Sequence, residues 1–259
     1  MQTITLKLNL LSIITLGIYS AWVKVRNHQY FYGNTHLNNT TFEYTAKPLQ
    51  ILKGRLIAFA FFVGYTVLAK VSPVFSLVLA VLFLIALPWI VVASLRFNTR
   101  NTSYRNISFR FSGSLFGALK AFILWPLLGI ISLGLLFPFA WKKQTHYIIA
   151  NHSYGRSAFN FDVNVIEYYK VIGVILAGGL VFAGVLYSFF DIAALSAGNV
   201  GAGALMAMLP MMLLYVVFYL AVAAYFIVAM ANIQLNGTGL VQHRFAANWR
   251  VGSYACCCS

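Results

Sequence analysis

Acidic residues are almost absent from this sequence. Among 259 residues there are four acidic side chains and 18 lysines and arginines, and charged residues of both signs make up only 8% of the chain. A soluble domain carries about a quarter of charged residues. With 61% hydrophobic residues and a mean hydropathy of +0.81, this chain cannot cover a water-exposed surface. The composition predicts an α-helical integral membrane protein, because apolar runs in lipid must satisfy their own backbone hydrogen bonds.

The shortage of acids leaves a formal net charge of +14. In a soluble protein this charge would point to nucleic acid. In a membrane protein, lysine and arginine concentrate in cytoplasmic loops and contact anionic headgroups. We therefore expect the lipid bilayer, with anionic phospholipid headgroups, as the partner and expect no nucleic acid. A homo-oligomer or an unidentified protein partner is left open.

Cysteine is equally scarce, and the familiar motifs of catalysis are missing. The three cysteines are consecutive, at 256–258, and the sequence contains no GxxxxGK[ST], HExxH or CxxC motif. The five histidines have few acidic neighbours with which to hold a metal. The long apolar runs contain no carboxylate away from their ends. A membrane hydrolase would need a nucleophile paired with a base, and we can assemble no such pair from this sequence. We expect no enzyme activity, no catalytic residue, no cofactor and no metal site.

The chain does contain a repeat, at an offset of 117 residues. Residues 10–44 align without a gap to residues 127–161, so that Leu16-Gly17 matches Leu133-Gly134 and Asn34 matches Asn151. A gapless match of this length predicts a tandem duplication. We place the first repeat at 1–126, the second at 127–245 and an atypical tail at 246–259.

Six apolar segments are predicted to enter the membrane. Four are about as long as the bilayer requires, at 49–70, 74–95, 168–190 and 204–231. The segment 8–22 is short, and 115–141 is interrupted by Pro126 and Pro138. All basic loops lie on the cytoplasmic side only if 115–141 returns to the side from which it entered. We therefore predict that 8–22 and 115–141 are re-entrant or interfacial. The alternative is six crossings, with the 142–170 loop outside.

The loops repeat as well. In three of them an asparagine is followed eight residues later by a phenylalanine, as in Asn34 and Phe42, and a fourth, stretched copy runs from Asn236 to Phe245. Turn-forming residues followed by alternating aromatics are typical of hairpins. We predict small cytoplasmic β-hairpins near 28–44, 96–111, 146–161 and 232–245.

Several of these motifs resemble one known family. The stretches Asn9-Leu10-Leu11 and Thr15-Leu16-Gly17-Ile18-Tyr19, then Trp22 and Lys24-Val25-Arg26, are similar to the signature of the YjgN family of bacterial inner-membrane proteins. The resemblance covers residues 9 to about 245 and implies a multi-pass protein of the bacterial inner (cytoplasmic) membrane. Family members carry more sequence at both ends, so we expect a fragment or a non-native C-terminal end. The family brings a domain of unknown function and no established activity.

Two functions are open on this sequence. Duplication, proline-interrupted segments and glycine-bearing helices favour a transporter or channel-like protein for a small solute or lipid, with its site between the repeats. The alternative is a non-transporting membrane scaffold or envelope factor whose cytoplasmic basic-aromatic loops bind anionic lipid or a protein partner. The residues predicted to make those contacts are Trp22, Lys24, Arg26, Tyr30, Trp141, Lys142, Lys143 and Tyr147.

Overall fold

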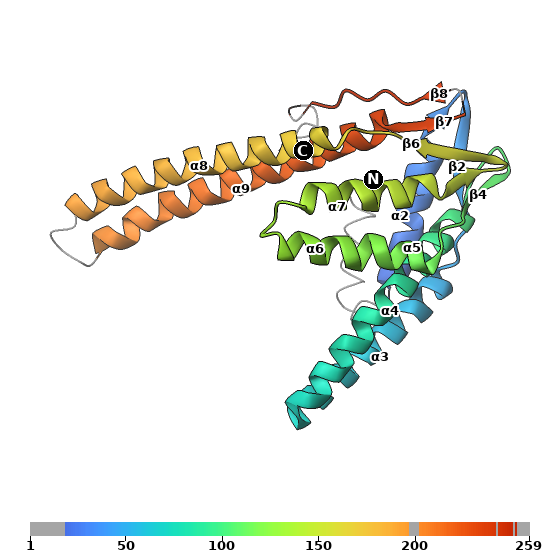
Figure 1. The fold of residues 1–259 in the computed structure, drawn as a ribbon, viewed down its shortest axis with the longest axis horizontal. Helices are drawn as coiled ribbons and strands as arrows, with labels where there is room; N and C mark the ends of the chain where they lie inside the picture. Colours follow the sequence, from blue (N-terminus) through green and yellow to red (C-terminus); the bar gives the residue numbers. More distant parts are fainter. Residues whose placement is uncertain (1–18, 197–201, 242, 251, 253–259) are drawn as a thin grey trace. The chain divides into compact units, whose positions relative to one another are not determined.

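The computed structural model describes residues 19–196, 202–241, 243–250 and 252. The chain forms two compact units. Unit 1 comprises Met1–Leu124 with Ala150–Phe159, and unit 2 comprises Trp125–Ile149 with Asn160–Ser259. Both are built from helices joined by short strands (Figure 1). Each unit is described separately below.

Unit 1 contains a first helix, a hairpin and a pair of long helices. Helix α2 (Ser20–Asn34) leads into β1 (His36–Leu37) and β2 (Thr40–Tyr44), and α3 (Pro48–Val71) and α4 (Pro73–Arg100) follow. The proline at the start of α3 has no N–H to leave unsatisfied, and Gln50 Oε1 accepts a hydrogen bond from the Lys47 backbone. At the turn between α3 and α4, the Ser72 hydroxyl accepts a hydrogen bond from the backbone N–H of Val74 and so caps the start of α4. Strands β3 (Thr102–Tyr104) and β4 (Ile107–Phe111), helix α5 (Leu115–Leu119) and the π-helix η1 (Lys120–Leu124) complete the sequence up to unit 2.

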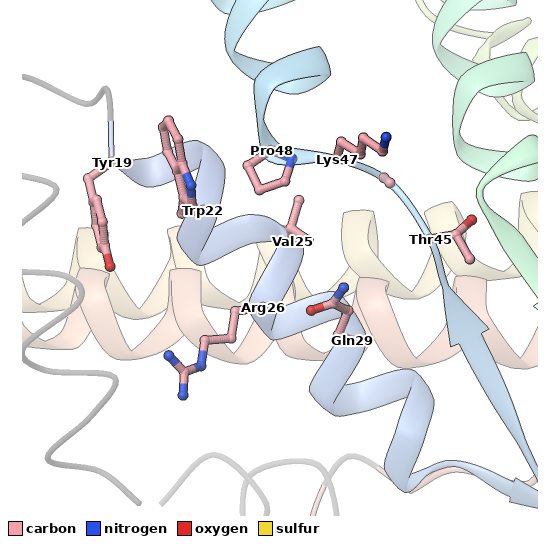
Figure 2. A pocket seen from close by; sticks show the side chains of 9 residues that line it. Tyr19, Trp22, Val25, Arg26, Gln29, Thr45, Lys47 and Pro48 are labelled. Atoms are coloured by element: carbon pink, nitrogen blue, oxygen red, sulfur yellow. The ribbon is translucent and has the colours of Figure 1, made fainter.

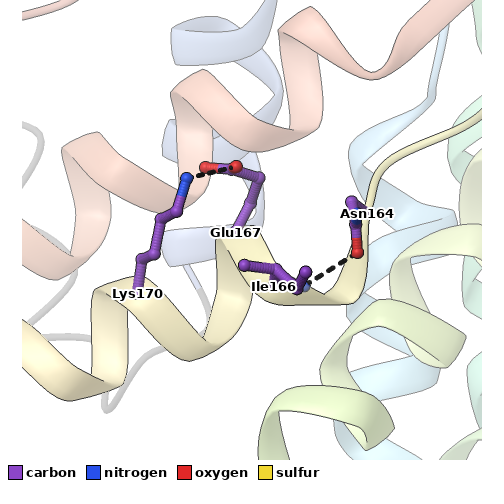
Figure 3. Close-up of polar contacts among 4 residues, drawn as sticks. All are labelled: Asn164, Ile166, Glu167 and Lys170. Carbon is purple, nitrogen blue, oxygen red and sulfur yellow. Dashed lines mark hydrogen bonds and ion pairs between the residues drawn. The ribbon is translucent and has the colours of Figure 1, made fainter.

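Unit 2 contains a short helical hairpin and a second long pair. Helices α6 (Trp125–Ile131) and α7 (Phe137–Ala150) precede α8 (Val165–Ser196) and α9 (Ala202–Asn236). Helices α8 and α9 lie side by side and contact each other (Figure 1). At the start of α8 the side chain of Asn164 accepts a hydrogen bond from the backbone of Ile166, and Lys170 pairs with Glu167 (Figure 3). The core of this unit contains Tyr168, which is fully buried against Val171 and Met230.

The predicted hairpins are present and follow the helix ends. They are β1–β2, β3–β4, β5–β6 (His152–Tyr154 and Ser157–Phe161) and β7–β8 (Thr238–Leu240 and His243–Arg244), all antiparallel. The turns place Asn38, Asn39, Arg105 and Asn106 at positive φ, as two-residue hairpin turns require. The strands run in the order of the chain, from β1 to β8. The hairpins are shorter than predicted, because residues 28–34 continue α2 and residues 232–236 continue α9.

Among the residues that the structure describes, four helices are long and apolar enough to cross a membrane. They are Pro48–Lys70, Val74–Arg100, Val165–Ser188 and Pro210–Asn236, which confirms the four long helices expected from the sequence. At most 6% of the most apolar stretch of each is buried within the chain, so their apolar side chains face outward. An outward-facing apolar surface of this length is the mark of a helix surrounded by lipid.

The segment 115–141 is not one continuous helix. An apolar helical stretch covers Leu115–Ile131, and the chain then turns back before α7 begins at Phe137. The turn places Leu133 and Gly134 at positive φ, and Gly129 lies so close to the Phe137 ring that a Cβ there would be 3.1 Å from it. Pro138 does not break a helix, because it lies at the second position of α7. Pro126 lies within the helical stretch Leu115–Ile131, directly after the π-helix η1, and does not end it. Of the other short segment, 8–22, residues 8–18 lie outside the described residues.

Candidate functional site

The basic side chains of α2 lie on two different faces of the helix. Ser20, Lys24 and His28 follow one another at four-residue intervals, which places them on one face. Trp22 and Arg26 are likewise four residues apart and occupy another face. Between these faces, Ala21, Val23 and Val25 are buried. The buried residues fix α2 against β2 and α3, and each charged face therefore borders a cleft.

The first cleft, called here the Arg26 cleft, lies between α2 and the start of α3. It has a volume of about 580 Å³ and is lined by Tyr19, Trp22, Val25, Arg26, Gln29, Thr45, Ala46, Lys47 and Pro48. The rings of Tyr19 and Trp22 are stacked with their centroids 6.1 Å apart. Figure 2 shows Val25 beside Pro48, with Arg26 on one side of the cleft and the amino group of Lys47 extending away from α2 on the other. The cleft therefore has an aromatic and apolar lining with the positive charge of Arg26, and the amino group of Lys47 extends outward from its edge.

The second cleft, called here the Arg55 cleft, lies on the other charged face of α2. It has a volume of about 440 Å³, and its polar lining consists of Ser20, Lys24, Asn27, His28 and Arg55. An Arg55 guanidinium nitrogen donates a hydrogen bond to the Ser20 hydroxyl and so connects α3 to α2. His28 stacks on the Tyr44 ring, with centroids 4.9 Å apart. Burial, followed by the positive charge of Lys24, lowers the pKa of His28 below its ordinary value of 6.5.

The predicted contact residues of unit 2 are arranged differently. Trp141 lines an apolar groove of about 540 Å³, called here the Trp141 groove, together with Phe137 and Ile172, and packs against Phe226 at 5.3 Å between ring centroids. The amino group of Lys143 lies over the rings of Phe139 and Trp125, at 5.3 and 6.0 Å from their centroids. Lys142 is half-buried and Tyr147 is buried.

The eight predicted contact residues therefore do not form one site. Trp22 and Arg26 share the first cleft, Lys24 belongs to the second, and Tyr30 is exposed and packs edge-on against Phe31. The prediction missed Lys47 and Arg55, whose signal in the sequence is that they flank the first turns of a spanning helix. It also missed His28, for which only the four-residue spacing to Lys24 gives a signal. Within the described ranges no three His, Cys, Asp or Glu side chains come together as metal ligands would.

Comparison with known proteins identifies the family. The model of a family described as "Bacterial protein of unknown function (DUF898)" matches residues 3–258. Inner membrane protein YjgN of Escherichia coli O157:H7 is 30% identical over 182 residues, which are 69% of this chain and 42% of that protein. The YjgN protein of Salmonella typhimurium is 26% identical over 175 residues, 67% of this chain and 42% of that protein.

The matched segment thus spans about two fifths of the length of these relatives, and no solved structure matches the chain. The relatives are named inner membrane proteins, and the four apolar helices fit a multi-pass protein of that membrane. The family match covers nearly the whole chain and agrees with the resemblance seen in the sequence motifs. The chain belongs to the DUF898 family of bacterial proteins, which includes the YjgN inner membrane proteins.

Proposed function

We propose that this protein binds anionic phospholipid headgroups at the start of α3 and acts as a membrane scaffold or envelope factor. The observation that supports this most is the place of the Arg26 cleft. Lys47 and Pro48 line the cleft and also begin a helix long enough to span the bilayer. The first turn of a spanning helix lies at the membrane–water interface, where phosphate groups are found.

The chemistry of the cleft suits a phosphate diester attached to apolar chains. Arg26 and Lys47 supply positive charge, and the first turns of α2 and α3 contain no acidic residue to neutralise it. Trp22 and Tyr19 supply amphipathic rings of the kind enriched at headgroup depth. Each basic side chain near an anionic surface contributes roughly 1 kcal/mol. Two of them beside one cleft favour anionic over neutral lipid by a modest amount.

We also propose the topology that the charges predict. The basic loops and hairpins lie in the cytoplasm, and the chain is a tandem duplication of one unit. The α6–α7 hairpin, which reverses direction at residues 132–136, supports a re-entrant segment over 115–141. Labelling of a cysteine placed at Ser157 in intact cells and in inverted vesicles tests this topology, because modification from the periplasmic side would contradict it.

Transport of a small solute or lipid remains a prediction from the sequence. The clefts in which charge gathers lie at the start of α3 and not along a spanning pair, so we place headgroup binding first. Flux measured in proteoliposomes across a panel of solutes tests transport directly.

Lipid retention tests the proposed function. The protein is purified from membranes into nanodiscs that contain equal amounts of phosphatidylglycerol and phosphatidylcholine, and the lipid that survives transfer to detergent is counted by native mass spectrometry. We expect the wild type to retain phosphatidylglycerol preferentially and R26Q/K47Q to lose that preference. K53Q is the matched control, because Lys53 is an exposed lysine of α3 outside both clefts. Equal retention of both lipids by the wild type would overturn the proposal.

A further inference from the structure

The Arg55 cleft and the Trp141 groove occupy equivalent positions in the two units. Ser20, Lys24 and Arg55 line the cleft in unit 1. The residues 117 positions further along the chain are Phe137, Trp141 and Ile172, and all three line the groove in unit 2. Unit 2 therefore packs the corresponding helices without a hydroxyl, a lysine or an arginine at these positions.

The two units differ in whether these three positions carry charge. A half-buried charge such as that of Arg55 costs free energy unless it is paired. At the same three positions unit 2 has apolar residues that line the groove, and Trp141 also packs against the core. Unit 2 therefore forms its groove without charge at these positions. The cleft in unit 1 is positively charged and has no acidic residue in its lining, which favours an anionic ligand.

We propose that the Arg55 cleft is a second anion site, which binds one phosphate group, and that a phosphate bound there draws a proton onto His28. The inference rests on the proposed lipid-binding function, because it takes the start of α3 to lie at headgroup depth. The phosphate can come from a phospholipid headgroup or from free phosphate, and the experiment below distinguishes the two.

Three donors line the same cleft. Arg55 lies seven residues beyond Pro48, which is about 10 Å along the helix at 1.5 Å per residue. Its hydrogen bond to the Ser20 hydroxyl directs the guanidinium toward α2. Lys24 follows Ser20 by one turn and His28 follows Lys24 by another, on the same face. A guanidinium fork, an ammonium and an imidazole on one cleft form a donor set suited to phosphate oxygens.

The same arrangement couples binding to protonation. The groups that face His28 are Lys24 and Tyr32 of α2, Tyr44 of β2 and, across the cleft, Arg55 of α3. In the empty cleft, burial and the charge of Lys24 lower the pKa of His28, so the ring is neutral at pH 7. A phosphate offsets the charges of Lys24 and Arg55 and accepts a hydrogen bond from the imidazolium, which raises that pKa. By reciprocity, lower pH strengthens phosphate binding.

The titration of His28 tests the inference. The full chain, with ¹⁵N-labelled histidine, is placed in phosphatidylcholine nanodiscs with and without phosphatidylglycerol, and the ring signals are followed by NMR from pH 5 to 8. We expect the His28 midpoint to be higher by about one pH unit in the anionic discs, as for a neighbouring opposite charge. The exposed His36 reports the shift caused by the surface potential alone. A third sample, phosphatidylcholine discs with inorganic phosphate, shows the same rise only if free phosphate is a ligand.

Two variants make the result specific. In R55Q the His28 midpoint should be the same in the two kinds of disc. In K53Q it should still be higher in the discs that contain phosphatidylglycerol. If R55Q fails to fold, R55K takes its place. R55K retains the positive charge but not the guanidinium fork, so the His28 midpoint should differ less between the two lipids than it does in the wild type. A His28 midpoint that moves no more than that of His36, or that moves equally in R55Q, would overturn the inference. The lipid-retention experiment with R26Q/K47Q tests the Arg26 cleft alone. The proposed function can therefore hold even if the His28 midpoint does not shift.

Discussion

The two pairs of spanning helices, α3–α4 and α8–α9, begin with different charges. At the start of α3, Lys47 and Arg55 border clefts that contain no acidic residue. At the start of α8, Asn164 and Ile172 stand at the positions 117 residues further along, and the nearby Lys170 is paired with Glu167 at 2.8 Å. The start of α3 is therefore positively charged, whereas at the start of α8 one lysine is paired with a carboxylate and the position of the arginine is apolar. Both starts lead into a helix long enough to span the membrane, so a spanning helix does not require these charges.

The largest expected effect concerns packing in unit 2. Tyr168, at the position equivalent to Ile51 in unit 1, is fully buried in the core formed by α8 and α9. We expect Y168A to lower the free energy of unfolding by about 3–5 kcal/mol, because truncation of a buried aromatic leaves a cavity. Unfolding in mixed detergent micelles measures this loss. Y187A is the control, since Tyr187 is 70% exposed on the same helix, and an equal loss in both variants would contradict the assigned core.

The second prediction compares two basic residues 117 positions apart. We expect R26Q to weaken retention of phosphatidylglycerol about five-fold, which corresponds to about 1 kcal/mol for one basic side chain at the surface. K143Q should change it less, because the Lys143 amino group lies over the rings of Phe139 and Trp125. Native mass spectrometry of the two variants measures how much phosphatidylglycerol each retains. A larger loss in K143Q would reverse the comparison between the units.

The third prediction concerns pH in the absence of anionic lipid. The pKa of His28 is lowered in the folded state relative to 6.5, so the unfolded chain takes up a proton first as the pH falls. The stabilisation is complete above about pH 6.5 and is lost as the pH falls through the folded pKa. We expect unfolding in phosphatidylcholine to become easier between pH 7 and pH 5. In H28F the loss of stability between pH 7 and pH 5 should disappear. If H28F loses as much stability over this range as the wild type, the loss does not come from His28.

The smallest expected effect is that of the ion pair at the start of α8. Both side chains are about half exposed or more, and exposed pairs three or four residues apart contribute roughly 0.3–0.5 kcal/mol. E167Q should lower the free energy of unfolding by no more than this, as measured in the same micelles. A loss several times larger would mean that the start of α8 depends on charge as the start of α3 does.

Much of the fold could be read from the sequence. Length and hydropathy located the four long helices, and the asparagine–phenylalanine spacing located the hairpins, because both signals are local. The charges predicted that 115–141 returns to the side from which it entered. The position of the turn, at residues 132–136, could not be read, since it depends on the contact of Gly129 with the Phe137 ring. The prolines suggested breaks at 126 and 138. Pro138 instead stands near the start of α7, where a missing N–H costs little, and Pro126 lies within the helical stretch Leu115–Ile131, just after the π-helix η1.

The site could be predicted only in part. Trp22, Lys24 and Arg26 were found as a basic-aromatic cluster, but adjacent residues of a helix point to different faces, and the structure divides them between two clefts. Arg55 and Ser20 are 35 residues apart, and no spacing rule joins them. The contrast between Arg55 and Ile172 emerges only when the clefts of both units are compared.

A structure in nanodiscs containing phosphatidylglycerol, determined by electron cryomicroscopy, tests the central claim most directly. We predict headgroup density in the Arg26 cleft, beside Arg26 and Lys47, and only acyl-chain density in the Trp141 groove. Headgroup density in the Trp141 groove with none in the Arg26 cleft would contradict the account.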